Sequence, residues 1–287
     1  SQDAVDMFFM GNGLAINDPN SGYDETGFGA VENHCYDPDY KDKKTDQNIS
    51  NMYANREPRF YASVVYQGRS WFKKWMNGNP NYIVDFSAGG GNDLSNGDNV
   101  KTGYMLGKFK NRTVNHASGD TQSWKRVSII YRLAEFYLFY AEALNETDPS
   151  NPDIIKYIDM VRERAGIPGY QTMNDNGIKT GIIGNYDKQF DAIQHERYVE
   201  LYCEGQRYFD IRRWMICGDK DRIGCDQTRF YGMNMKGSKD KTPGEPTSYY
   251  TRTKVENRQW TDKLYLYPIH QNVIELANGR IPQNYGW

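Results

Sequence analysis

The segment of residues 191–214, DAIQHERYVELYCEGQRYFDIRRW, constrains the fold more than any other part of the chain. Glu196, Glu200 and Glu204 recur every four residues, so on a helix they form one stripe. Like charges at this spacing destabilise a helix by about 0.2–0.5 kcal/mol per pair unless cations neutralise them. The same segment supplies four cations that we expect to do so: Arg197, Arg207, Arg212 and Arg213.

Apolar and aromatic residues fill the positions between these charges. They are Tyr198, Val199, Leu201, Tyr202, Tyr208, Phe209, Ile211 and Trp214. So much apolar surface is not typical of a solvated helix. The segment therefore predicts two helices that break at Gly205 and are held by ion pairs that are at least partly buried. We interpret its charged residues as a structural ion-pair motif: Glu196, Arg197, Glu200, Glu204, Arg207, Asp210, Arg212 and Arg213.

The same residues carry a family resemblance. ERYVELYCEGQRYFDIRRW resembles the ERRxELxFEGxRxxDLRRW signature of the SusD/RagB family, the surface glycan-binding lipoproteins of Bacteroidetes. Three further segments, residues 55–71, 130–146 and 266–287, resemble the same family in the same order. The chain departs from the family pattern at Tyr198, where Arg is commoner, and at His270, where Pro is commoner.

The resemblance implies both a fold and a function. The implied fold is mainly α, a SusD-like α-α superhelix of tetratricopeptide-like helical hairpins with long irregular loops and a few short strands. The implied function is non-catalytic capture of oligosaccharide or polysaccharide at the extracellular face of the outer membrane, followed by delivery to a SusC-like TonB-dependent transporter. In the family, the lipid anchor and most of the helical-repeat half lie upstream. We therefore expect this chain to be the carboxy-terminal part, associated with the membrane only through that upstream anchor.

Composition limits the partners. A net charge of −2 gives no reason to expect nucleic acid. Aromatic residues make up 14% of the chain, with 23 Tyr, more than an ordinary core requires. Because Tyr and Trp combine a flat apolar body with a polar tip, they suit wet interfaces. The surplus favours a binding surface, although many of these rings must also be core.

Hydrophobic periodicity predicts one helical hairpin. After residue 127, apolar positions step by three or four: Leu133, Phe136, Tyr137, Tyr140, Ala141 and Leu144. Asn145 and Pro149 end this helix, and the next begins with Asn151 as its cap and Pro152 at its first position. Gly166 closes the second helix. A repeat array needs several such hairpins, and only one is visible, so we expect the others upstream.

We divide the chain at residue 125. Residues 1–125 are predicted to be a loop-rich ligand-binding region and residues 126–287 a helical carboxy-terminal region, both parts of one SusD-like domain. Within the first region, Phe60, Ala62, Val64 and Tyr66 alternate after Pro58, which predicts a short strand over residues 56–66. The glycine-rich residues 86–99 lack the Gly-Lys-Ser/Thr ending of a phosphate loop, which excludes a nucleotide site there.

Four rings are our candidates for stacking on a sugar: Trp71, Trp75, Tyr82 and Trp124. The axial C–H face of a sugar ring packs on an indole, and polar residues surround these positions. Trp71 and Trp75 are four residues apart, so on a helical turn they share one face. The alternative interpretation is a hydrophobic plug against the helices. These rings are chosen by composition and placement, because no family motif fixes the ligand contacts.

Catalysis is the less favoured interpretation. Glu196 and Glu200 are close enough on a helix to suggest the carboxylate pair of a glycoside hydrolase. Each has an arginine in reach, however, which lowers its pKa and removes the candidate acid. We therefore predict no enzymatic activity. The stronger alternative is a peptide- or protein-binding nutrient-uptake lipoprotein of the RagB type, because helical repeats are common protein-binding surfaces.

We expect no cofactor. Two acidic groups could nevertheless hold a structural Ca²⁺: Asp18 with Asp24, and Asp37 with Asp39 and Asp42. Neither group has EF-hand spacing. His195 is interpreted as a satisfied core residue rather than a metal ligand. Cys217 and Cys225 could form a disulfide across a loop, although free buried thiols are the expected state.

Overall fold

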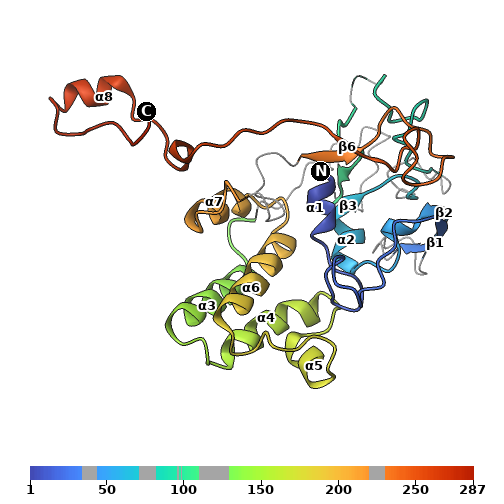
Figure 1. Ribbon diagram of the computed structural model, residues 1–287, viewed down its shortest axis with the longest axis horizontal. Coiled ribbons are helices and arrows are strands. Elements are labelled where there is room, and N and C mark those ends of the chain that lie inside the picture. The colour runs from blue at the N-terminus through green and yellow to red at the C-terminus, as the bar shows by residue number, and fades with distance from the viewer. Residues whose placement is uncertain (34–43, 71–81, 96, 98, 110–128, 220–229) are drawn as a thin grey trace.

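The computed structural model describes residues 1–33, 44–70, 82–95, 97, 99–109, 129–219 and 230–287 (Figure 1). Its α-helices are α1 (Gln2–Asp6), α2 (Pro58–Ser63), α3 (Leu133–Thr147), α4 (Asp153–Arg164), α5 (Tyr170–Asp175), α6 (Tyr186–Glu200), α7 (Gln206–Arg213) and α8 (Gln271–Leu276). Short 3₁₀ turns, η1 (Asn51–Tyr53) and η5 (Asp262–Tyr265), join them. Among the described residues, no helix has the length and apolar composition that crossing a bilayer requires.

The strands are short and pair two by two, each pair antiparallel. They are β1 (Phe28–Asn33) with β2 (Lys44–Ser50), β3 (Val64–Val65) with β4 (Met105–Leu106), and β5 (Tyr231–Met233) with β6 (Arg252–Lys254). Long irregular connections separate these ladders. The prediction of a mainly helical fold with long loops and a few short strands is therefore confirmed.

The charged segment forms two helices, as predicted. α6 ends at Glu200 and α7 begins at Gln206, directly after Gly205. Gly205 has φ +89°, a left-handed conformation that costs a residue with a Cβ about 1–2 kcal/mol. At the other end of α6, the Asn185 side chain accepts a hydrogen bond from Lys188 N (3.1 Å) and caps the helix.

α3 and α4 form the predicted hairpin. Asn151 accepts a hydrogen bond from Asp153 N through Oδ1 (3.0 Å), which satisfies a donor in the first turn of α4. Gly166 follows the helix at φ +85° and ends it. With α5 and α6, the hairpin encloses one core: Leu14, Leu138, Ala141, Ile154, Ile155, Ile158, Val161, Tyr170, Met173, Ile182, Ala192 and Ile193.

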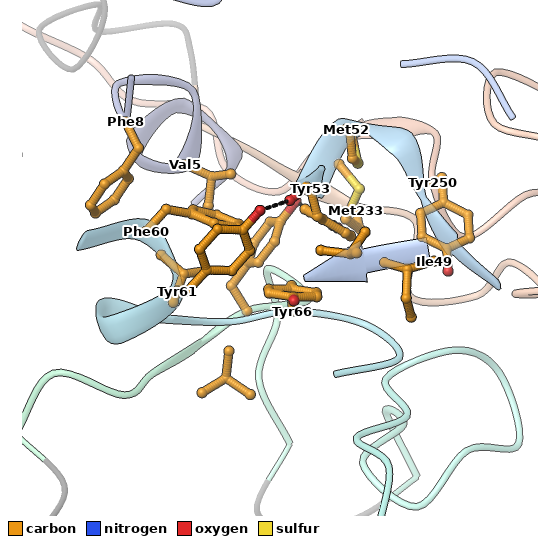
Figure 2. Close-up of a cluster of buried hydrophobic side chains, with 14 of the residues drawn as sticks. Val5, Phe8, Ile49, Met52, Tyr53, Phe60, Tyr61, Tyr66, Met233 and Tyr250 are labelled. Atoms are coloured by element: carbon orange, nitrogen blue, oxygen red, sulfur yellow. Dashed lines mark hydrogen bonds between the residues drawn. The ribbon is translucent and has the colours of Figure 1, made fainter. Parts of the chain in front are cut away.

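A second, more aromatic core brings together residues from both ends of the chain (Figure 2). The ring of Tyr66 stacks on Tyr53 at 4.6 Å and on Phe60 at 5.5 Å. The hydroxyls of Tyr53 and Tyr104 lie 3.1 Å apart, so burial does not leave them unsatisfied. Part of the tyrosine surplus is therefore core: Tyr53, Tyr61, Tyr66, Tyr104, Tyr249 and Tyr250.

The predicted strand over residues 56–66 is wrong for most of its length. Residues 58–63 form helix α2, and only Val64 and Val65 extend, as β3. Pro58 occupies the first helical turn, where its missing N–H costs nothing. The neighbours Phe60 and Tyr61 are both buried, which one turn of helix allows and an alternating strand does not.

The last residues form a tail that leaves the rest of the molecule beyond β6 and carries α8 at its far end (Figure 1). It is joined to the region after α7 where Cys217 N donates a hydrogen bond to Tyr265 Oη (3.1 Å). The tail also folds on itself. Trp287 Nε1 donates to the carbonyl of Lys263 (3.0 Å), and Gln283 Nε2 donates to the carbonyl of Ile269 (2.9 Å).

Candidate functional site

The acidic stripe of α6 lies inside a buried ion-pair network that joins distant parts of the chain. Glu196 accepts hydrogen bonds from Arg59 Nη1 of α2 (2.6 Å) and Arg162 Nη1 of α4 (3.3 Å). Glu200 also bonds Arg59 (2.8 Å), together with Arg132 and Arg164. These cations come from other elements and hold α2, α3 and α4 against α6.

The charged residues next to the break at Gly205 form a second set of ion pairs. Arg197 donates to both carboxylate oxygens of Asp210 (2.9 Å each), across the break at Gly205. The prediction that Arg197 neutralises Glu200 is therefore wrong. Arg197 pairs with Asp210, whereas the cations that pair with Glu200 come from outside α6. Glu204 is paired with Arg132 Nε (2.6 Å) instead. The bidentate pair fixes the angle between α6 and α7.

These ion pairs set the chemistry of the motif carboxylates. Burial alone would raise the pKa of Glu200, but Arg59, Arg132 and Arg164 lower it to about 2. Glu200 is therefore ionised at neutral pH and cannot donate a proton to a glycosidic oxygen. Burial raises the pKa of Glu57, which nevertheless pairs with Arg59 Nε (2.6 Å). The network holds helices α2, α3, α4 and α6 together, and within it Glu200 is not available as a catalytic acid.

A groove lies between the loop of residues 11–20 and helices α5 and α6. It consists of two hollows of about 730 and 400 Å³, which share Ala15, Asn17, Asp191 and His195. Its floor is mostly apolar: Phe9, Leu14, Tyr170, Met173, Ile182 and Ala192. Its rim is polar: Asn17, Asp18, Asn20, Lys179, Lys188 and Asp191. The volume lies in the range of small-ligand sites.

His195 and the residues around it make the floor rigid. The His195 ring stacks on Phe9 at 4.1 Å, and its Nε2 lies 2.6 Å from the Met7 carbonyl. Burial lowers the pKa of His195 to about 4, so the imidazole is neutral at pH 7 and Nε2–H donates to that carbonyl. The Arg162 guanidinium lies over both Phe9 (4.7 Å) and Tyr170 (4.0 Å). His195 is thus a satisfied structural residue.

The rim loop is held in one conformation by close contacts. Gly13 has φ +81°, and a Cβ there would lie 2.8 Å from Arg162 Nη2, which donates to the Gly13 carbonyl (2.7 Å). Asn12 accepts from Leu14 N through Oδ1 (3.1 Å). Asp18 pairs with Lys179 Nζ (2.6 Å). The rim therefore presents amide, carboxylate and ammonium groups, which can form hydrogen bonds with hydroxyls.

Of the four predicted stacking rings, only Tyr82 lies within the described residues, and it does not line this groove. Trp71, Trp75 and Trp124 lie outside the described residues. Tyr82 is half-buried and packs against the aromatic core. The groove does not show in the sequence, because Asp18 and Lys179 of its rim are 161 residues apart. The one local signal is the turn-rich segment GNGLAINDPNSGY, which predicts a loop at the position where the groove has its rim.

The candidate metal and disulfide residues are distributed as follows. Asp18 is engaged by Lys179, whereas Asp24 accepts hydrogen bonds from Thr26 N (2.7 Å) and Asn51 Nδ2 (3.2 Å). Asp37, Asp39, Asp42 and Cys225 lie outside the described residues. Cys217 is buried and its thiol donates to the Ile211 carbonyl (3.3 Å). Within the described part of the chain, no group of three His, Cys, Asp or Glu is arranged to hold a metal ion.

The chain is similar to known proteins over its whole length. A model of the SusD family matches residues 1–287. SusD-like protein P2 from Formosa agariphila is 37% identical over 82 residues, which is 29% of this chain and 16% of that protein. A solved SusD-like protein from Bacteroides fragilis is 26% identical with a TM-score of 0.70, over 100% of this chain and 46% of that one. The chain therefore spans less than half the length of either relative.

Proposed function

The chain belongs to the SusD family, and on this premise we propose that it captures oligosaccharide or polysaccharide at the bacterial cell surface. The single observation that carries the proposal is the family match over residues 1–287. The finer steps are also part of the proposal. The captured glycan is delivered to a SusC-like TonB-dependent transporter, and the whole protein is a lipoprotein on the extracellular face of the outer membrane.

The geometry supports binding without cleavage. Retaining and inverting glycoside hydrolases both need one carboxylic acid that is protonated near neutral pH. The two motif carboxylates that suggested such a pair, Glu196 and Glu200, are buried between arginines. The pKa of Glu200, lowered to about 2, is the opposite of what an acid catalyst requires.

We propose that the groove supplies hydrogen bonds to the glycan. The amides of Asn17 and Asn20 and the charged pair Asp18–Lys179 surround an apolar floor, as in sites that bind molecules with one apolar and one polar face. Each exchanged hydroxyl contributes only about 0.5–1.5 kcal/mol, so several contacts are needed. The stacking rings Trp71, Trp75, Tyr82 and Trp124 remain our proposal for the rest of the contact.

Affinity gel electrophoresis tests the function. The protein is run through gels that contain starch, xylan, mannan or a mixed-linkage β-glucan, beside Trp71→Ala, Trp75→Ala and Trp124→Ala. We expect retardation by at least one polysaccharide and its loss in one or more variants. Tyr285→Ala, which removes an 87% exposed ring on the tail, is the control. Absence of retardation by every glycan contradicts the proposal and favours the RagB-type peptide ligand, whereas release of reducing sugar would indicate an enzyme.

A further inference from the structure

Three aromatic rings outside the groove, Tyr186, Phe190 and Trp214, lie together where α6 meets the end of α7. Tyr186 and Phe190, one helical turn apart on α6, have parallel ring planes (6°) with centroids 6.0 Å apart. Trp214, just after α7, meets Phe190 at 78° and 6.0 Å. We call these three residues the aromatic corner.

Polar side chains fix the corner. Trp214 Nε1 donates to Glu142 Oε1 of α3 (2.8 Å), and the Arg213 guanidinium lies 4.4 Å from the indole centroid. Burial would raise the pKa of Glu142, but the hydrogen bonds from Arg213 and Trp214 hold it below its usual range. At the other end, Tyr186 Oη donates to Glu146 Oε1 (2.8 Å). These contacts join three helices, so the rings are ordered before any ligand arrives.

The corner differs from the buried aromatic core in access and in surroundings. Tyr186 is 39% exposed, whereas Tyr53 is fully buried. Phe190 and Trp214 are half-buried. Charged groups of both signs stand at its edge, since Glu146 is exposed and the Arg213 side chain is 36% exposed. Ordered rings beside a carboxylate and a guanidinium offer an apolar face together with hydrogen-bond donors and acceptors.

We propose that the aromatic corner is a second carbohydrate-binding surface, on which a sugar ring stacks against Tyr186 and Phe190 while Glu146 and Arg213 bond its hydroxyls. Trp214 and its partner Glu142 act as positioning residues that hold Phe190 in place. The inference rests on the proposed function and deepens it, because two surfaces on one protein bind one polysaccharide chain more tightly than either does alone. The occupant is thus a polymer that extends beyond a single site.

The test uses the polysaccharide that retards the wild-type protein in gels. Loss of one stacking contact, of about 0.5–1.5 kcal/mol, corresponds to roughly twofold to tenfold weaker binding, and we expect Tyr186→Ala to lose retention in that range. Trp214→Phe keeps an aromatic ring but removes the bond to Glu142, and we expect a smaller loss. Thermal unfolding of both variants shows whether they are folded, and Tyr285→Ala again serves as the exposed-ring control.

A direct contact measurement separates this inference from the proposed function. The protein is labelled with 5-fluorotryptophan, and Trp214→Phe assigns the Trp214 resonance. We expect that resonance to shift when the retarding polysaccharide is added to wild type, and to shift less in Tyr186→Ala. If the polysaccharide retards both wild type and Tyr186→Ala equally and the Trp214 resonance stays in place, the second surface is disproved while glycan capture stands. If no glycan retards wild type, the proposed function itself fails first.

Discussion

Two faces of α6 carry charged residues in opposite environments. On one face, Glu196 and Glu200 are buried and paired with arginines from α2 and α4. On the other, Lys188 and Asp191 are exposed at the rim of the groove. The helical period of 3.6 residues separates these two sets around a single helix.

The comparison shows that surroundings, not residue type, decide what a charge does. A buried carboxylate between arginines is expensive to desolvate, so it persists only with its partners and acts as scaffold. An exposed carboxylate or ammonium exchanges partners with water at little cost and can exchange them with a ligand. α6 therefore holds the fold with one face and offers the other to the groove.

The largest expected effect is on the buried face. Arg59→Met leaves Glu57, Glu196 and Glu200 without a shared cation, and we expect the free energy of unfolding to fall by about 3–5 kcal/mol. Urea denaturation measures it. Lys156→Ala is the matched control, because its pair with Asp153 (3.0 Å) is 58% exposed on the lysine side and should contribute less than about 1 kcal/mol. Equal effects of the two substitutions would contradict the distinction between buried and exposed ion pairs.

The buried glutamates of α6 should also make the stability of the protein sensitive to acid. The pKa of Glu200 is lowered to about 2 in the folded protein from an ordinary value of 4.5. The unfolded chain therefore binds a proton first as the pH falls, so this stabilisation is complete above about pH 4.5 and is lost between pH 4.5 and 2. The full loss is on the order of 3 kcal/mol, and urea denaturation at pH 7, 5, 4 and 3 should show about 2 kcal/mol of it by pH 3. Glu200→Gln is less stable at pH 7, and its stability should depend less on pH in this window.

Local pattern predicted the elements of the charged segment but not their partners. The four-residue spacing of glutamates and the glycine at 205 act within one or two turns, so α6, α7 and the break between them follow from sequence. The identity of the cations depends on tertiary packing, because Arg59 lies 137 residues before Glu196. At α2, the local pattern was misleading. The alternation of apolar residues predicted a strand, but residues 58–63 form a helix that buries the adjacent rings of Phe60 and Tyr61.

The groove was not predictable for the same reason. Its lining comes from residues 6–20 and 170–195, together with Arg207 and Asp219, and no motif links these segments. Surplus tyrosine indicated a binding surface, but several of these rings turned out to be core. Composition cannot separate a buried ring from an exposed one, since both need the same flat apolar body.

A smaller effect is expected at the groove loop. Gly13→Ala and Gly22→Ala place a Cβ on backbone with φ +81° and +73°, so both carry a similar conformational cost. Only Gly13 also brings that Cβ within 2.8 Å of Arg162 Nη2. We expect Gly13→Ala to be destabilised by about 1–3 kcal/mol more than Gly22→Ala in thermal unfolding. If the two variants unfold alike, the close approach of the loop to α4 is not what holds the rim.

The smallest effect on stability is expected at the rim itself. Lys179→Ala breaks the partly exposed pair with Asp18, and Lys239→Ala breaks a similar pair with Asp85 at the same distance of 2.6 Å, outside the groove. Each should change stability by less than about 1 kcal/mol. If the groove binds sugar, Lys179→Ala alone loses about 0.5–1.5 kcal/mol of binding, a roughly twofold to tenfold weaker retention in the gels. Equal retention by the two variants would mean that the Asp18–Lys179 part of the rim does not contact the glycan, because the two pairs differ mainly in their position relative to the groove.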